Sequence, residues 1–141
     1  METMTDEDRR GFLAAGAQTA ALATVRADGR PHVAPIWFQT DGDDLIFTTW
    51  CDSVKGRNLR RDPRAAVSVD DPTFPFAFVV LEGDCSISED LAELSRWSHR
   101  IAARYVPPER AAEFGDRNAV PGELLVRLVP THTTAQHGIA D

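Results

Sequence analysis

Two Asp-Gly turns constrain the N-terminal part of this chain more than any other feature. The runs AALATVR and PHVAPIWFQT flank ADGR at residues 27–30, and DGDD at residues 41–44 leads into LIFTTW. An Asp-Gly pair between runs rich in β-branched and aromatic residues is typical of a tight hairpin. The sequence therefore predicts an antiparallel meander with strands at residues 20–26, 31–40 and 45–50.

The rest of the chain predicts further strands and a few short helices. Strands are expected at residues 64–70, 76–87 and 123–130, and helices at residues 5–16, 53–62, 88–105 and 106–115. Consecutive antiparallel strands, six or so in number, favour a mainly β fold with flanking helices, a closed or nearly closed barrel. We expect one domain over residues 1–141, with an N-terminal helix within residues 1–16 and a polar tail at residues 131–141.

Composition limits the classes of function. The 141 residues are 43% hydrophobic and 26% charged, which is typical of a soluble globular protein. A formal net charge of −7 argues against a nucleic-acid or anionic-membrane binder. No segment resembles a membrane span or a secretion signal, and Cys51 and Cys85 belong to no CxxC pair. We therefore expect a cytoplasmic protein with reduced thiols.

The stretch SVKGRNLRRDPR, residues 53–64, departs from this acidic balance. It holds five of the 15 basic side chains and one acid, and Lys55 is the only lysine in the chain. Ser53 is a good N-cap for a helix of about two turns that ends near Pro63, and the first turn of a helix attracts anions. The segment suits a ligand with several anionic groups, although a solvated basic helix that balances an acidic surface has the same pattern.

The predicted strand at residues 31–40 is apolar on both faces. Val33, Pro35 and Trp37 point one way, and Ala34, Ile36 and Phe38 point the other. Antiparallel strands with one solvated face alternate apolar and polar residues, so a ligand or another subunit must cover the second face. A flat apolar wall beside phosphate donors is what a cofactor with a ring and a phosphate needs.

The runs TVRADGRPHVAPIWF, LIFTT, KGRNLRRDPRAAVSV and VVLEGDCSI, within residues 12–130, carry a family resemblance. The chain resembles the split β-barrel flavin and deazaflavin oxidoreductases of the pyridoxamine 5′-phosphate oxidase-like superfamily, the FMN-binding split barrels. Within that superfamily it is most similar to the coenzyme F420-dependent branch. The joint occurrence of these motifs at these spacings is specific.

This resemblance implies a homodimer with two cofactor sites at the subunit interface. Carried over by position, Lys55, Arg57 and Asn58 hold the cofactor phosphate, and Arg60 or Arg61 reaches its outer anionic groups. The residues expected to line the tricyclic ring are Val33, Ala34, Pro35 and the backbone of Thr48 and Thr49. The phospholactyl and oligoglutamate tail of coenzyme F420 suits the extra arginines better than FMN, which ends in one phosphate.

We therefore expect an oxidoreductase that uses reduced coenzyme F420 to transfer a hydride to an electron-poor small molecule such as an enone or quinone. The alternatives are an FMN-binding reductase or oxidase of the same fold and a cofactor-binding protein without turnover. Oxidation of pyridoxamine phosphate is not expected, because the tail THTTAQHGIAD lacks the Trp and Arg that those oxidases use. No catalytic side chain is assigned, and the substrate is expected to depend on residues 70–78 and 107–122.

The remaining candidate residues are interpreted as structural. His132 and His137 have no Cys or carboxylate at ligand spacing, so no metal site is predicted. His32 is expected to face solvent, the alternative being a contact with the cofactor or a role as proton donor. The three tryptophans are expected in the core or an interface, and the i, i+4 arginines Arg96, Arg100 and Arg104 on a solvated helix face.

Overall fold

The structure, a computed structural model, describes all residues from Met1 to Asp141. Its strands are β1 (Glu2–Thr3), β2 (Ala20–Val25), β3 (Pro31–Ile36), β4 (Gln39–Asp41), β5 (Asp44–Trp50), β6 (Arg64–Asp71), β7 (Ala77–Ser88) and β8 (Glu123–His137). Its helices are α1 (Asp6–Ala14), α2 (Val54–Arg61), α3 (Leu91–Tyr105) and α4 (Ala111–Arg117), with a 3₁₀ turn at Pro108–Arg110. No helix combines the length and apolar character needed to cross a membrane.

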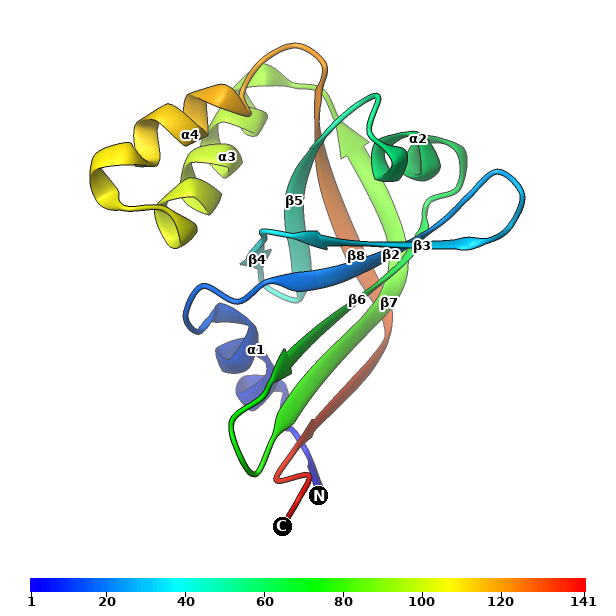
Figure 1. Cartoon of the computed structure of the whole chain (residues 1–141), viewed down its shortest axis with the longest axis vertical. Helices are drawn as coiled ribbons and strands as arrows, with labels where there is room; N and C mark the ends of the chain where they lie inside the picture. Colours follow the sequence, from blue (N-terminus) through cyan, green and yellow to red (C-terminus); the bar gives the residue numbers. More distant parts are fainter.

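All eight strands belong to one antiparallel sheet in the order β3-β2-β6-β7-β8-β5-β4, with β1 beside β8 (Figure 1). Both Asp-Gly turns form as predicted, with Gly29 at φ 88° in the β2–β3 hairpin and Gly42 at φ 61° in the β4–β5 hairpin. Strand β3 pairs only with β2, so its other edge is free. The expected mainly β split barrel with flanking helices is confirmed.

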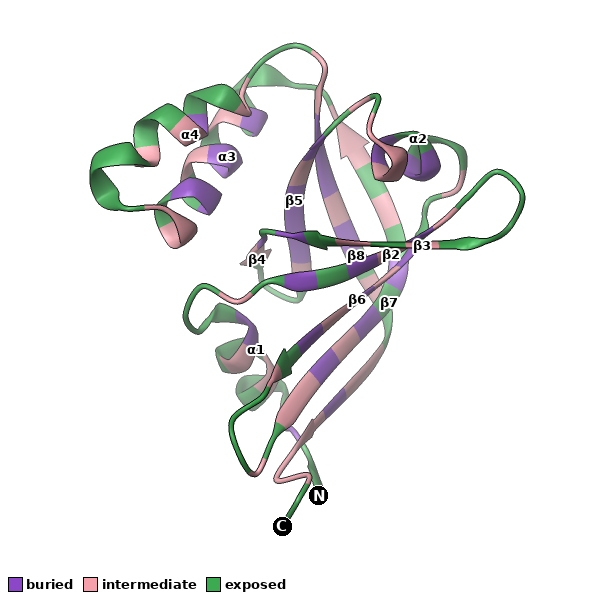
Figure 2. Ribbon diagram, in the orientation of Figure 1, coloured by how far each residue is buried: buried purple, intermediate pink, exposed green.

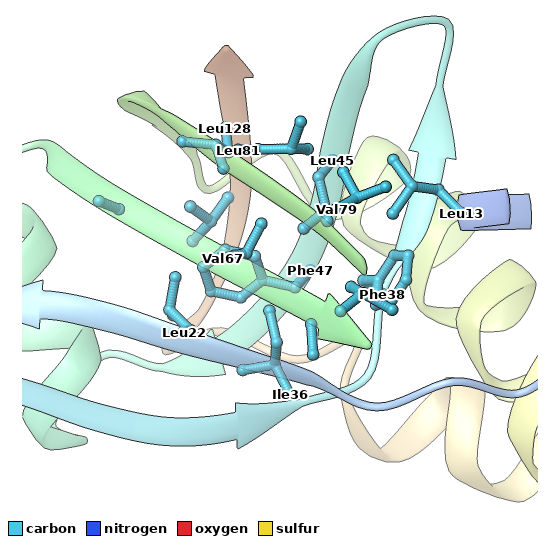
Figure 3. Packing of buried hydrophobic residues seen from close by; sticks show 14 of the residues in the cluster. Leu13, Leu22, Ile36, Phe38, Leu45, Phe47, Val67, Val79, Leu81 and Leu128 are labelled. Carbon is cyan, nitrogen blue, oxygen red and sulfur yellow. The ribbon is translucent and has the colours of Figure 1, made fainter. Parts of the chain in front are cut away.

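The sheet encloses one apolar core. The side chains that Figure 3 draws point toward one another from β2, β3, β5, β6, β7 and β8, with Leu13 added from α1. Figure 2 shows that buried residues recur along β2, β6 and β7. A smaller cluster of Ile46, Leu94, Trp97 and Leu125 lies on the other face of β5 and β8, where α3 covers the sheet. Strand β5 is therefore buried on both faces.

The strand predicted at residues 31–40 is divided into β3 and β4, which pair with β2 and β5 respectively. Two further segments differ from the sequence prediction. Residues 131–137 were expected to be a polar tail, but they continue β8 to His137 because β7 and β1 pair with them. Within this segment Ala135 is buried in the core. Gly115 does not end the fourth helix; it lies inside α4, where a Cβ would come within 2.3 Å of the His99 ring. Both differences come from tertiary partners that local sequence patterns do not reveal.

The expectation that Arg104 lies on a solvated helix face is wrong. Its guanidinium donates hydrogen bonds to the carbonyl oxygens of Gly16 at 2.8 Å, Phe38 at 2.9 Å and Leu13 at 2.8 Å. These carbonyls lie where α1 and β3 end, at the C-terminal end of α3. Arg104 therefore fixes three elements to one another, whereas Arg96 and Arg100 remain exposed beside Trp97.

We expect Arg104→Ala to lower the free energy of unfolding by about 2–3 kcal/mol, because three carbonyls lose a charged donor. Arg30→Ala is the control, since the Arg30 side chain is 82% exposed and its ion pair is with the neighbouring Asp28, at 3.6 Å. Urea unfolding of both variants measures the difference. An effect of Arg104→Ala no larger than that of the control would show that Arg104 does not hold these three elements together.

Candidate functional site

A cleft with a volume of about 390 Å³ lies beside the free edge of β3. In Figure 1 this region is bordered by α2 on one side and by α3 and α4 on the other, with β5 between them. The residues that line the cleft are Thr19, Pro35, Ile36, Trp37, Thr48, Lys55, Ile101 and Asn118. The structure thus brings together three of the predicted cofactor residues, Pro35, Thr48 and Lys55, from three different elements.

Helix α2 is held tightly at the end of β5. The Ser53 hydroxyl accepts the Gly56 N–H at 3.0 Å and lies 2.8 Å from the Thr49 hydroxyl. At Gly56 a Cβ would lie 2.5 Å from the Trp50 carbonyl oxygen, so a side chain there would push the helix away. The cap and the glycine therefore fix the position from which Lys55 reaches the cleft. The buried Thr49 side chain contributes to this anchoring.

The structure leaves several cations of the basic segment without an acidic partner. Arg60 pairs with Glu89 at 3.0 Å, and Arg64 pairs with Asp62 at 2.7 Å. The hydrogen bonds from Arg64 lower the pKa of Asp62 to about 2. Lys55, Arg57 and Arg61 have no carboxylate oxygen within 4.0 Å. An anionic ligand at α2 would meet these three side chains without first breaking an ion pair.

The predicted anion-binding residues lie on two sides of α2. Lys55 lines the cleft, whereas Arg57, Asn58 and Arg61 line a second hollow of about 410 Å³ together with Arg26. Arg26 was missed by sequence reasoning, because nothing in the sequence indicates that the end of β2 lies beside α2. The hollow with three arginines adjoins the helix that carries Lys55. A ligand with separated anionic groups can therefore contact Lys55 in the cleft and the arginines in the hollow.

Asn58 links α2 to the barrel. Its side chain is 4% exposed, donates to the Thr24 hydroxyl at 3.0 Å, and accepts from Arg61 at 3.0 Å. His32 lies opposite Thr24 in the register of β2 and β3 and is partly buried. The expectation that His32 faces solvent is wrong: its Nδ1 is buried and has no hydrogen-bond partner.

The outer face of β3 forms an apolar wall next to the cleft. Val33 is 64% exposed and Trp37 is 41% exposed, whereas Ile36 and Phe38 on the inner face are buried. A shallow hollow along this wall includes the predicted ring-lining residues Val33, Ala34 and Pro35. The prediction of a strand that is apolar on both faces is therefore confirmed, and a single chain leaves the outer face open.

The tryptophans differ in burial. Trp97 lies in the core at 3% exposure, whereas Trp37 and Trp50 are partly exposed, Trp50 against Gly122. The expected substrate-determining segment at residues 107–122 reaches the cleft through Asn118. The loop at residues 70–78 instead lies beside both termini, where it lines another hollow, and contributes nothing to the cleft.

Glu123 is an ionisable group near the cleft that sequence reasoning did not single out. Glu123 of β8 lies opposite Trp50 of β5, and its side chain is on the same face of the sheet as Thr48. Burial raises the pKa of Glu123 above its ordinary value, and the positive charge of Lys55 opposes this rise. The charge of Lys55 thus acts on Glu123 although the two side chains form no ion pair within 4.0 Å.

Comparison with known proteins identifies the family. Residues 5–136 match the family model described as pyridoxamine 5′-phosphate oxidase, so the chain belongs to this family, which includes oxidoreductases. This confirms the resemblance inferred from the sequence motifs.

Solved structures agree with this assignment. The conserved hypothetical protein Rv2991 from Mycobacterium tuberculosis superposes with a TM-score of 0.83 and 26% identity, over 96% of this chain and 86% of that one. A protein named F420 reductase superposes with a TM-score of 0.68 and 29% identity, over 87% and 94% of the two chains. An FAD-binding protein from Mesorhizobium loti, 18% identical over 95% of each chain, shares the fold with a TM-score of 0.71. Proteins named for flavin and for deazaflavin chemistry therefore share this fold.

The pKa of Glu123 provides a test of the arrangement around Lys55. Lys55→Ala should raise the pKa of Glu123 further, because a positive charge that favours the carboxylate is removed. Lys55→Arg keeps the charge and serves as the control. Carboxyl-detected NMR titration of the ligand-free protein measures both, and an unchanged pKa in Lys55→Ala would place the lysine away from Glu123.

Proposed function

We propose that this chain is an oxidoreductase that binds reduced coenzyme F420 and delivers its hydride to an electron-poor small molecule such as an enone or quinone. The proposal rests on the cleft in which the apolar wall of β3 lies beside Lys55, the only lysine of the chain. An apolar wall and an anion donor at one site are the two requirements of a ring cofactor that carries a phosphate.

The residues present fit the ring and phosphate. In the proposal, Val33, Ala34 and Pro35 and the backbone of Thr48 and Thr49 lie along the ring. Lys55 donates to the phosphate, for which it has no competing carboxylate. Asn58 is also assigned to the phosphate, although its bonds to Thr24 and Arg61 already use part of its hydrogen-bonding capacity.

The arginines favour a cofactor with more than one anionic group. Arg57 was expected at the phosphate, but it lies with Arg61 and Arg26 around the hollow on the second side of α2, away from the cleft that Lys55 lines, so we assign it to the outer anionic groups instead. FMN has a single phosphate, whereas coenzyme F420 carries additional carboxylates that three arginines can hold. Arg60 can also reach such a group, but it would first have to give up Glu89, so its contribution should be smaller.

The cofactor supplies the hydride chemistry when bound, and the protein supplies binding, orientation and exclusion of water. Lys55 and the arginines fix the anionic end, and this places the ring against the wall of β3. Ile101 and Trp37 restrict water at the far end of the cleft. No acid–base pair of the protein is required for hydride delivery, which agrees with the lack of an assigned catalytic side chain.

A second copy of the chain is proposed to cover the outer face of β3 and to complete the cofactor site. The exposure of the apolar side chain of Val33 on this face is typical of an interface that a partner buries. Sedimentation velocity should therefore give a dimer at micromolar concentration. A monomer that retains bound cofactor would contradict the interfacial site.

Substitutions on α2 test the anion contacts. Lys55→Ala should weaken binding of coenzyme F420 by about 1.5–3 kcal/mol, because a charged donor to the phosphate is lost. Arg57→Ala should weaken coenzyme F420 more than FMN, since it removes a contact to the outer anionic groups. Arg60→Ala removes the same type of side chain from the same helix and should have a smaller effect.

Cofactor fluorescence measures these dissociation constants, and turnover is followed by reoxidation of the reduced cofactor in the presence of enones or quinones. Equal effects of Arg57→Ala and Arg60→Ala would contradict the proposed path of the anionic tail. Tight binding without turnover of any acceptor would make the chain a cofactor-binding protein.

A further inference from the structure

Trp37 forms a flat aromatic surface at one end of the cleft. Its ring lies parallel to Tyr105, with 4.9 Å between the centroids and 4° between the planes. Trp37 lines the cleft whereas Tyr105 does not, so Tyr105 supports the tryptophan from behind. The stacked pair therefore leaves the other side of the indole available to a ligand.

This aromatic surface is held in place by hydrogen bonds. The Tyr105 hydroxyl donates to the Gln18 carbonyl oxygen and accepts the Phe38 N–H at 3.1 Å. The neighbouring Arg104 donates to the Phe38 carbonyl oxygen at 2.9 Å. Tyr105 and Arg104 thus both bind the backbone of Phe38, the residue that follows Trp37. The indole is therefore pre-positioned, and a ligand that stacks on it does not have to order a mobile side chain.

The polar groups at this end of the cleft are few and neutral. Asn118 lines the cleft beyond the end of α4, and its side chain has no hydrogen-bond partner within the chain. Ile101 contributes an apolar surface from α3. A primary amide can donate to a carbonyl or nitro oxygen but offers no charge to an anion. This end of the cleft therefore differs from the cationic end at Lys55.

We propose that Trp37 and Asn118 form the acceptor subsite, which takes a planar conjugated carbonyl compound. The plane of the acceptor stacks on Trp37, and its carbonyl oxygen accepts a hydrogen bond from the Asn118 amide. Stacking of two flat π systems favours a planar acceptor over a puckered one of the same size. This inference rests on the proposed function, and it adds the residues that bind the acceptor and the planarity for which they select.

The amide also acts on the reaction. When a conjugated carbonyl compound accepts a hydride, a C–H bond of the reduced deazaflavin breaks, the cofactor is oxidised, and a new C–H bond forms at the alkene carbon far from the carbonyl. The C=C π bond breaks, the negative charge moves onto the carbonyl oxygen of the resulting enolate, and solvent then protonates the carbon next to the carbonyl. A donor aimed at that oxygen stabilises the charge as it develops. Asn118 should therefore affect kcat, whereas Trp37 should mainly affect KM.

The test uses 4-phenylbut-3-en-2-one, a planar enone, and its saturated analogue 4-phenylbutan-2-one, which keeps the phenyl and carbonyl groups but loses the conjugation. Ligand-observed NMR of the protein without cofactor should show tighter binding of the enone. Trp37→Leu should weaken enone binding and raise its KM about tenfold, and Trp37→Phe should restore most of both. Asn118→Ala should lower kcat about tenfold or more with a smaller change in KM.

The dissociation constant of coenzyme F420 is measured for each variant and should not change. If Trp37→Leu weakens cofactor binding as much as enone binding, Trp37 contacts the cofactor and the subsite is rejected. Equal binding of the two ketones, or an unchanged KM in Trp37→Leu, also rejects it. If wild type binds no coenzyme F420 but Trp37→Leu still abolishes enone binding, the proposed cofactor fails while the subsite stands.

Discussion

The site depends on β3, which packs one face into the barrel and leaves its other face and one edge exposed. Its inner residue Ile36 is buried in the core together with Phe38, which follows the strand, and its outer residues Val33 and Pro35 remain exposed in a single chain. The chain then turns into β4, which pairs with β5, so no strand covers the free edge of β3. One strand thus supplies core packing, an open edge and an apolar wall. The cleft forms where that edge faces β5, α2 and α3.

The polar anchors of the flanking helices explain why the cleft keeps its shape. Ser53 and Gly56 seat α2 against the end of β5, and Asn58 ties the same helix to β2 through Thr24. On the opposite side, Arg104 joins α3 to the carbonyls that end α1 and β3. Hydrogen bonds of this kind are costly to break singly, so they fix the positions of α2 and α3 in addition to the apolar contacts of these helices. The two ends of the cleft are thereby fixed independently.

Much of this arrangement could be predicted from the sequence, and the exceptions share one physical origin. The hairpins, α2 with its Ser53 cap and the two apolar faces of β3 all follow from local periodicity and turn chemistry. The extension of β8 beyond residue 130 and the hydrogen bonds of Arg104 depend on strands and carbonyls distant in sequence. For the same reason the sequence did not indicate that Arg26 lies beside α2, or that Lys55 and Arg57 lie on different sides of this helix. Packing decides which face of the helix lines which hollow.

We propose that the anionic ligand held at α2 is coenzyme F420. A fluorescence titration of the purified ligand-free protein with coenzyme F420 and, in parallel, with FMN at the same ionic strength tests this proposal. We expect micromolar or tighter binding of the deazaflavin and much weaker binding of FMN. Preference for FMN would contradict it and make the chain a flavin protein, and binding of neither would leave Lys55 and its neighbouring arginines as a surface cluster.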